Sequence, residues 1–235
     1  MLSGGKKKRA PADCSEVGKD GGVVAGLRYL EFVTKGADPS QPLPMLLVFH
    51  SRGGRPEGFT GWRYSVKSPA RIILPAGPYR LGSYRTWFDL PAKTSKQDEL
   101  SEQMQATGDI TAEFIRQIAQ CRPTLGKPMA VGTSQGGSMT LLMTNQYPHL
   151  VGGGVAVAGW LTDDLWRSSM RPTYVLHGEY DTTVPFERTK QKALEMKSRG
   201  AEIAFQQFAT AHKDGDGMHK QMRKHVNHLL NFVDS

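Results

Sequence analysis

The sequence predicts an α/β domain with a mostly parallel sheet and helices on both faces. Short apolar runs, typical of buried strands, alternate with longer amphipathic stretches, typical of helices. Such strands, joined by helical crossovers, pair side by side and are covered on both faces. The 235 residues are enough for one α/β domain with a sizeable core and too few for two large ones.

The elements follow one another in a regular order. Residues 25–34 alternate between apolar and polar side chains like a half-buried strand, and 43–50 and 71–74 have the composition of buried strands. An amphipathic helix is predicted over 97–120, followed by a strand before Ser134 and a helix after it. The remaining predicted elements are a strand at 152–159, a strand at 172–178, a helix near 185–199, a strand at 201–209 and a helix near 219–234.

Charge and hydropathy divide the chain into a flexible basic leader, residues 1–20, and one domain, residues 21–235. The net charge is +8, but four basic residues stand together in the leader as "KKKR" and the others are spread thinly. We therefore expect a basic surface and no nucleic-acid partner. No run of 18 apolar residues exists, so no membrane span is predicted. Without the apolar segment of a signal peptide we expect a cytoplasmic protein, or a secreted or periplasmic one if a signal peptide was removed.

Two cysteines, Cys14 and Cys121, are present, and their spacing matches no metal motif. We expect no metal and no cofactor. Reduced cysteines are the default in a cytosolic chain, whereas a disulfide between leader and domain would indicate an oxidising compartment, and the sequence leaves both open.

The motif "GTSQG" points to nucleophilic chemistry at Ser134. It lies between a short apolar run and a helix-like run that Pro148 ends, which is the strand–turn–helix setting of G-x-S-x-G. Gly132 and Gly136 are expected where side chains would collide with neighbouring backbone. A serine hydroxyl presented on such a turn becomes a nucleophile when a base lies beside it.

The acid partner should follow a later strand and precede the base. Asp181 fits, because it stands in a tight loop after the strand at 172–178 and orients the imidazole in such a triad. The other acids near these strands are expected to be solvated loop charges: Glu179, Asp163 and Asp164.

Two histidines compete for the role of base. His212 and His219 both follow the last predicted strand, and we favour His219 because it stands near the start of the final helix, with His212 as the alternative. His225 and His228 lie in the apolar-periodic run of that helix and are expected to be surface residues.

Backbone N–H groups should stabilise the oxyanion of the reaction. One donor is expected from Gln135, at the start of the helix after the serine, and the other from Arg52, in the glycine-rich loop after the strand at 43–50.

In these motifs and their order the chain resembles the small carboxylesterase, phospholipase and acyl-protein thioesterase family of α/β-hydrolases. The stretches that carry the resemblance span residues 43 to 190 in the order "VFHSRGG", "ILPAGP", "TWFDL", "GTSQGGSMTL", "VAVAGWL" and "HGEYDTTVP". The resemblance implies the α/β-hydrolase fold. Departures affect the acyl-binding wall: Thr133 replaces a large aromatic residue, Ser51 a glycine, Gly54 an aspartate and Arg52 an apolar residue.

These observations predict a serine hydrolase that cleaves carboxylic esters through an acyl-enzyme. Only twelve residues separate Gly159 from Pro172, where related hydrolases often insert a lid, so we expect little or no lid and soluble small-molecule esters with short to medium acyl groups. Arg52 predicts a preference for substrates that carry an anionic or polar group. The alternatives are an acyl-thioesterase or lysophospholipase-like activity and a non-catalytic scaffold that binds a ligand or partner.

Overall fold

A central eight-stranded sheet organises the chain. The computed structural model describes Cys14, residues 20–212 and residues 216–231, so the predicted leader lies outside the described residues except for Cys14 and Asp20. The strand order is β1-β2-β4-β3-β7-β8-β9-β10. The strands span Gly21–Val24 (β1), Leu27–Val33 (β2), Met45–Phe49 (β3), Arg71–Pro75 (β4), Met129–Thr133 (β7), Gly153–Val157 (β8), Thr173–Gly178 (β9) and Ile203–Phe208 (β10).

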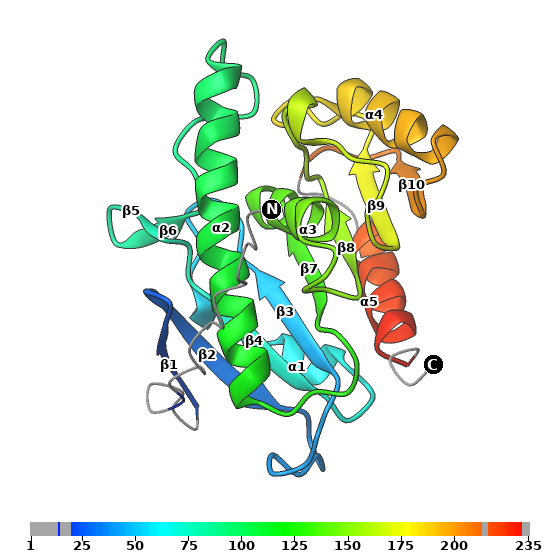
Figure 1. Cartoon of the computed structure of the whole chain (residues 1–235). Helices are drawn as coiled ribbons and strands as arrows, with labels where there is room; N and C mark the ends of the chain where they lie inside the picture. The colour runs from blue at the N-terminus through cyan, green and yellow to red at the C-terminus, as the bar shows by residue number, and fades with distance from the viewer. Residues whose placement is uncertain (1–13, 15–19, 213–215, 232–235) are drawn as a thin grey trace, which may run out of the picture.

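The six strands from β4 to β10 pair in parallel, and β1 and β2 add an antiparallel edge. The predicted α/β class with a mostly parallel sheet is therefore confirmed. The strand expected over 25–34 is wrong in detail, because Ala25 and Gly26 take positive φ angles of 48° and 77° and form the turn of the β1–β2 hairpin. A second hairpin, β5 (Tyr79–Leu81) with β6 (Tyr84–Thr86), was not predicted and stands off the sheet (Figure 1).

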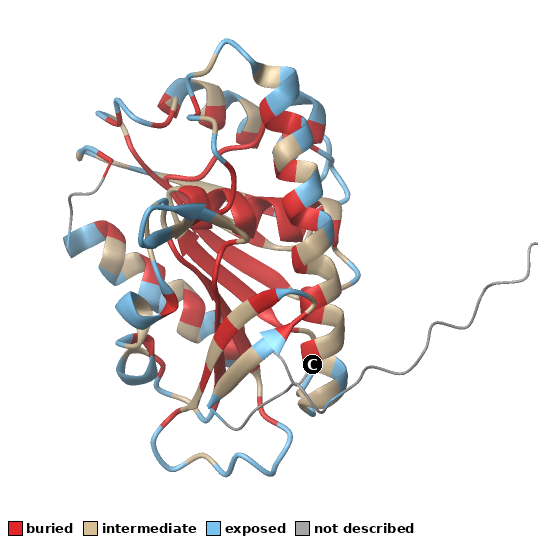
Figure 2. Ribbon diagram, turned by 90° about the vertical axis from the view of Figure 1, so that its left-hand side faces the viewer, coloured by how far each residue is buried: buried red, intermediate tan, exposed pale blue. Residues whose placement is uncertain are grey.

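Helices cover the sheet on both faces, and the buried strands lie between them (Figure 2). The helices span Trp62–Ser65 (α1), Gln97–Cys121 (α2), Gln135–Gln146 (α3), Phe186–Ser198 (α4) and Asp216–Asn231 (α5), with short 3-10 turns at Pro56–Phe59 (η2) and Asp163–Leu165 (η3). Side chains of α2, α3 and α4 share one apolar core with one sheet face, and those of α1 and α5 share a second core with the other.

Each core forms because one stripe of every helix is apolar. In α5 the buried stripe includes Met218, Met222 and Val226, which recur every four residues and so lie on one helix face. The helices predicted over 97–120 and 185–199 agree with α2 and α4 to within one residue at either end, whereas α5 begins three residues earlier than predicted.

A disulfide joins Cys14 to Cys121 at the end of α2. The sequence left open whether these two cysteines are reduced or bonded, and in the structure they form a disulfide. None of the helices in the described part of the chain combines the length and the apolar character needed to span a bilayer.

Candidate active site

Ser134 occupies a sharp turn between β7 and α3 in a strained backbone conformation. Its φ and ψ angles are 58° and −122°, a region that non-glycine residues rarely adopt. Two backbone bonds hold the turn: the Ser134 N–H donates to the Val157 carbonyl at 2.8 Å, and the Ser138 N–H donates to the Ser134 carbonyl at 2.9 Å. This backbone conformation presents the Ser134 side chain at the carboxyl end of β7.

Three glycines allow this turn. A Cβ on Gly132 would lie 2.3 Å from the carbonyl carbon of Gly136, and one on Gly136 would lie 2.1 Å from the Phe49 carbonyl oxygen. A Cβ on Gly137 would lie 2.5 Å from the Val157 carbonyl oxygen. The collisions predicted from the sequence are therefore present at Gly132 and Gly136, and Gly137 is subject to the same constraint.

Asp181 lies in the loop after β9, where both carboxylate oxygens are occupied. Oδ1 accepts the backbone N–H groups of Thr183 at 2.8 Å and Val184 at 2.9 Å, and Oδ2 lies 2.6 Å from His212 Nδ1 and 3.1 Å from His177 Nε2. Burial opposes ionisation, but the hydrogen bonds from His177, His212 and Val184 outweigh it and hold the pKa of Asp181 well below its usual range. Asp181 is therefore a fixed negative charge.

His212 bridges Asp181 and Ser134. Its Nε2 lies 2.9 Å from Ser134 Oγ while its Nδ1 faces the carboxylate, and the side chain is buried. Because an ionised Asp181 only accepts, Nδ1 carries a proton, and in the neutral imidazole Nε2 is left as an acceptor for the serine hydroxyl.

The preference for His219 over His212 disagrees with this geometry. His219 lies inside α5, which already begins at Asp216, and no contact between the described residues joins it to Ser134 or Asp181. The helix is held against the second core through Met218 and Met222, on either side of His219 in the sequence. The alternative, His212, is the histidine that contacts both Ser134 and Asp181.

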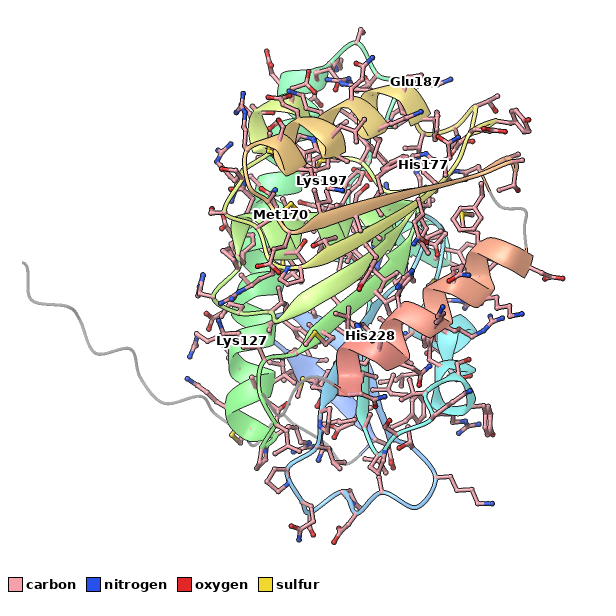
Figure 3. The ribbon with its side chains drawn as sticks, turned by 90° about the vertical axis from the view of Figure 1, so that its right-hand side faces the viewer. Lys127, Met170, His177, Glu187, Lys197 and His228 are labelled. Atoms are coloured by element: carbon pink, nitrogen blue, oxygen red, sulfur yellow. A yellow bond between two sulfur atoms is a disulfide. The ribbon has the colours of Figure 1, made fainter. Side chains whose placement is uncertain are left out.

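His177 is a partner of Asp181 that the sequence analysis missed. It is fully buried near the end of β9 (Figure 3). Its ring lies next to the Phe186 ring of α4 and the Phe205 ring of β10. Donation from its Nε2 to Asp181 gives the carboxylate a second imidazole N–H besides that of His212. The signal was available, since "HGEYD" puts a histidine four residues before the acid.

The two residues expected to donate to the oxyanion line the same pocket as Ser134. Gln135 is the first residue of α3, so its N–H has no partner inside the helix, and no hydrogen bond between described residues uses this N–H or that of Arg52. Arg52 lies in a turn closed by the Gly54 N–H, which donates to the Ser51 carbonyl at 2.9 Å. Ser51 Oγ donates to the Thr133 carbonyl at 3.0 Å and so ties this turn to β7.

His50 holds the same turn from below. Its Nε2 accepts the Gly77 N–H at 2.9 Å, its Nδ1 lies 2.8 Å from the Ser51 carbonyl, and its own carbonyl accepts Trp87 Nε1 at 2.8 Å. Burial lowers the pKa of His50 to about 4, so the ring is neutral at pH 7.

The side chain of Gln135 has a separate task, which the sequence analysis also missed. It is buried, and its Oε1 accepts Thr86 Oγ1 at 2.7 Å and the Trp87 N–H at 3.1 Å, while its Nε2 donates to the Phe88 carbonyl at 2.6 Å. The segment that contributes Leu90 to the wall of the site is thereby fastened to α3.

A pocket of about 290 Å³ opens above Ser134. Its apolar wall consists of Leu90, Pro91, Ala92, Trp160 and Val184. Ser51, Arg52 and His212 supply polar groups to the rim and floor. Between β8 and β9 the chain forms only η3, so no inserted domain covers the pocket.

The acids set aside in the sequence analysis lie elsewhere. Asp163 pairs with Arg188 at 3.2 Å, and Asp164 accepts a hydrogen bond from Ser101. Among the residues that the structure describes, no group of three or more His, Cys, Asp or Glu side chains converges as a metal site would require.

Comparison with known proteins agrees with this architecture. The chain is 27% identical to carboxylesterase SOBER1 of Arabidopsis thaliana over 63% of its own length and 72% of that protein. It is 25% identical to acyl-protein thioesterase 1 of Gibberella zeae over 72% of its own length and 83% of that protein.

Solved structures resemble the fold. The crystal structure of esterase PE8 superposes with a TM-score of 0.72 at 15% identity, covering 86% of this chain and 99% of that one. The Zea mays acyl-protein thioesterase 2 gives a TM-score of 0.68 at 18% identity, again over 86% of this chain and 99% of that one.

The model of the phospholipase/carboxylesterase family matches residues 30–232, a range that includes Ser134, Asp181 and His212. The protein therefore belongs to the phospholipase/carboxylesterase family and is a hydrolase with an α/β-hydrolase fold.

Proposed function

We propose that the protein is a serine hydrolase that cleaves carboxylic esters, with Ser134 as nucleophile, His212 as general base and Asp181 as the orienting acid. One observation carries the proposal: His212 lies 2.9 Å from Ser134 Oγ on one ring nitrogen and 2.6 Å from Asp181 on the other. The three residues come from the ends of three different strands, so ordinary local packing gives no reason for this alignment.

The first half-reaction follows from the atoms in place. Ser134 Oγ attacks the ester carbonyl carbon while its proton passes to His212 Nε2, and the carbonyl π electrons move onto the oxygen. The N–H groups of Gln135 and Arg52 stabilise this oxyanion. Its collapse breaks the bond to the alcohol oxygen, which takes the proton from His212 and leaves an acyl group on Ser134.

Water reverses the sequence. His212 accepts a proton from the water that attacks the acyl carbon, and then returns it to Ser134 Oγ as the carboxylic acid departs. Asp181 remains ionised throughout, because its low pKa keeps a negative charge opposite the imidazolium that forms in each half-reaction. The regenerated serine completes the cycle.

The pocket supports short to medium acyl groups on soluble substrates. Its volume of about 290 Å³ and its apolar wall accommodate a short acyl chain. The family relatives named above include a thioesterase, so thioester cleavage at the same serine is the alternative reaction; lysophospholipase-like activity is a further alternative. A non-catalytic scaffold is disfavoured because such a protein has no need of an aligned serine, imidazole and carboxylate.

The compartment is also a proposal. The Cys14–Cys121 disulfide favours an oxidising environment over the cytoplasm that the sequence led us to expect, because cytosolic thiols are kept reduced.

Hydrolysis of p-nitrophenyl butyrate by matched variants tests the triad. Ser134→Ala and His212→Ala should each lower kcat by roughly ten-thousandfold or more, because the members of a triad act as a unit. His219→Ala, the matched control on α5, should change kcat by about threefold at most. An active Ser134→Ala, or a dead His219→Ala beside an active His212→Ala, would refute the assignment. Parallel assays with butyryl-coenzyme A separate ester from thioester preference.

A further inference from the structure

A second hollow, of about 280 Å³, lies beside the active-site pocket and is lined by arginines. We call it the arginine hollow; it is formed by Arg28, Arg55, Arg80 and Arg85, with Glu57, Ser83 and Tyr84. Its one carboxylate, Glu57, is bonded to Arg28 at 2.8 and 3.2 Å. Four positive charges against one negative charge leave an excess of three around one small volume.

The three remaining guanidinium groups form no salt bridge among the described residues, although Glu57 also lies within electrostatic range of Arg55. Arg85 Nη1 donates to the Pro78 carbonyl at 3.3 Å, Arg55 lies 5.0 Å above the ring of Tyr84, and Arg80 is exposed at the rim. Among the described residues no salt bridge reaches these three. Like charges held around one hollow repel each other, and an anion bound between them would remove that cost.

The arginine hollow is connected to the active site through backbone. The Gly53 N–H donates to the Arg85 carbonyl at 2.9 Å, and the Arg85 N–H donates to the Gly54 carbonyl at 3.1 Å, so strand β6 pairs with the turn that carries Arg52. Arg52 lines the pocket over Ser134. Three residues of chain span at most about 11 Å, so Arg55 lies within that distance of Arg52, Cα to Cα.

We propose that the arginine hollow binds a carboxylate or phosphate group on the uncleaved part of the substrate, so that the preferred substrates are esters carried by extended anionic molecules. Guanidinium groups suit this role because their paired N–H donors match both oxyanions. Arg52 lines the pocket over Ser134 and stands next to Gly53, which bonds to Arg85, so it adds positive charge on the side of the reacting ester. The inference rests on the proposed ester hydrolysis and names its substrate class.

The test compares acetate release from three acetylated carbohydrates. Acetylated trigalacturonate carries carboxylates, acetylated glucose 6-phosphate carries a phosphate, and acetylated xylotriose is neutral. The wild-type kcat/KM should be at least tenfold higher for one or both anionic substrates than for the neutral one, and the pattern tells which oxyanion is bound. The preference should fall as salt rises, because exposed charges are screened.

Two arginine deletions separate local binding from the general positive field. Arg80→Ala should lower the anionic-to-neutral ratio of kcat/KM at least fivefold. Arg223→Ala removes the same charge from a larger hollow between α1 and α5, lined also by Tyr64 and Lys67, and should leave the ratio unchanged. An unchanged ratio in Arg80→Ala, or an equal fall in both variants, would overturn the proposal.

Binding to Ser134→Ala keeps this inference distinct from the proposed reaction. Calorimetry with unacetylated trigalacturonate and with inorganic phosphate measures the arginine hollow without turnover. A dissociation constant raised at least fivefold when Arg80→Ala is added, and not when Arg223→Ala is added, supports the anion site even if no ester is cleaved. Acetate release that persists in Ser134→Ala would refute the reaction alone. Absence of binding by both probes, together with no anionic preference in turnover, would refute the arginine hollow.

Discussion

Replacing Gln135 separates the role of its side chain from that of its backbone. In Gln135→Met the backbone N–H proposed as an oxyanion donor stays in place, but the buried amide that accepts from Trp87 and donates to Phe88 is lost. The Phe88 carbonyl keeps a donor, because Thr86 Oγ1 lies 2.8 Å from it and is released from Gln135 by the same change. The Trp87 N–H is left buried without a partner.

The size of the effect follows from that one orphaned donor. A buried unpaired N–H costs about 1–3 kcal/mol, so we expect the free energy of unfolding to fall by about 2 kcal/mol. For a domain of this size that corresponds to a drop in Tm of roughly 4–8 °C. Urea unfolding followed by tryptophan fluorescence measures the change, and a loss under about 0.5 kcal/mol would refute the reasoning.

Gln135→Glu adds a pH-dependent test at the same position. In the ionised form, a carboxylate oxygen would replace the N–H donor and face the Phe88 carbonyl, which is also an acceptor. This repulsion, together with burial, raises the pKa of the new Glu above its unfolded value of about 4.3. Below the unfolded pKa the new Glu is protonated in both the folded and the unfolded state, so the loss in unfolding free energy relative to wild type should be small near pH 4. The loss should grow as the pH rises, because ionisation is then easier in the unfolded state. Gln135→Met is the control without this titration, and a deficit that is equal at pH 4 and pH 8 would contradict the hydrogen-bond assignment.

Two further predictions concern buried titratable groups. Glu31 is buried between Arg71 and Arg122, so Glu31→Gln should lower the free energy of unfolding by about 3–5 kcal/mol. Glu57→Gln, the control at an exposed pair, should lower it by under about 1 kcal/mol, and equal losses in urea unfolding would contradict the buried network. His50 has a folded pKa of about 4 against about 6.5 unfolded, so its contribution to stability is present above pH 6.5 and is lost as the pH falls toward 4, by about 3 kcal/mol in all. His50→Gln should flatten the pH dependence of the unfolding free energy between those values, and an unchanged slope would show that another group causes it.

The sequence predicted the elements that have a clear local pattern. The buried strands are continuous apolar runs, and α2 is long enough for its helical periodicity to be clear. The glycines around Ser134 were also predicted, because close backbone contacts require them. The β5–β6 hairpin could not be found in this way, because each strand has only three residues and half of these residues are exposed. It is held by the pairing of Arg85 with Gly54, a contact between segments 31 residues apart in the numbering. The arginine hollow was missed for the same reason, although Arg52 predicts a preference for substrates that carry an anionic or polar group.

The choice between His212 and His219 depended on strand register. The sequence analysis favours His219 because it stands near the predicted start of the final helix. Helix boundaries are the least certain feature of a sequence-based prediction. Strand pairing explains why His212 lies beside Asp181: Phe208 of β10 stands opposite Gly178 of β9, and the Tyr180 N–H donates to the Thr210 carbonyl at 3.1 Å. Asp181 lies three residues beyond Gly178, and His212 four beyond Phe208, so two loops that leave the sheet side by side bring both to the same height above it. A Cβ on Gly178 would lie 2.4 Å from the Thr210 carbonyl oxygen, which explains the glycine in "HGEYD" and indicates that the two loops touch. Counting outward from the ends of the two predicted strands would have favoured His212, because reaching His219 requires seven more residues of chain.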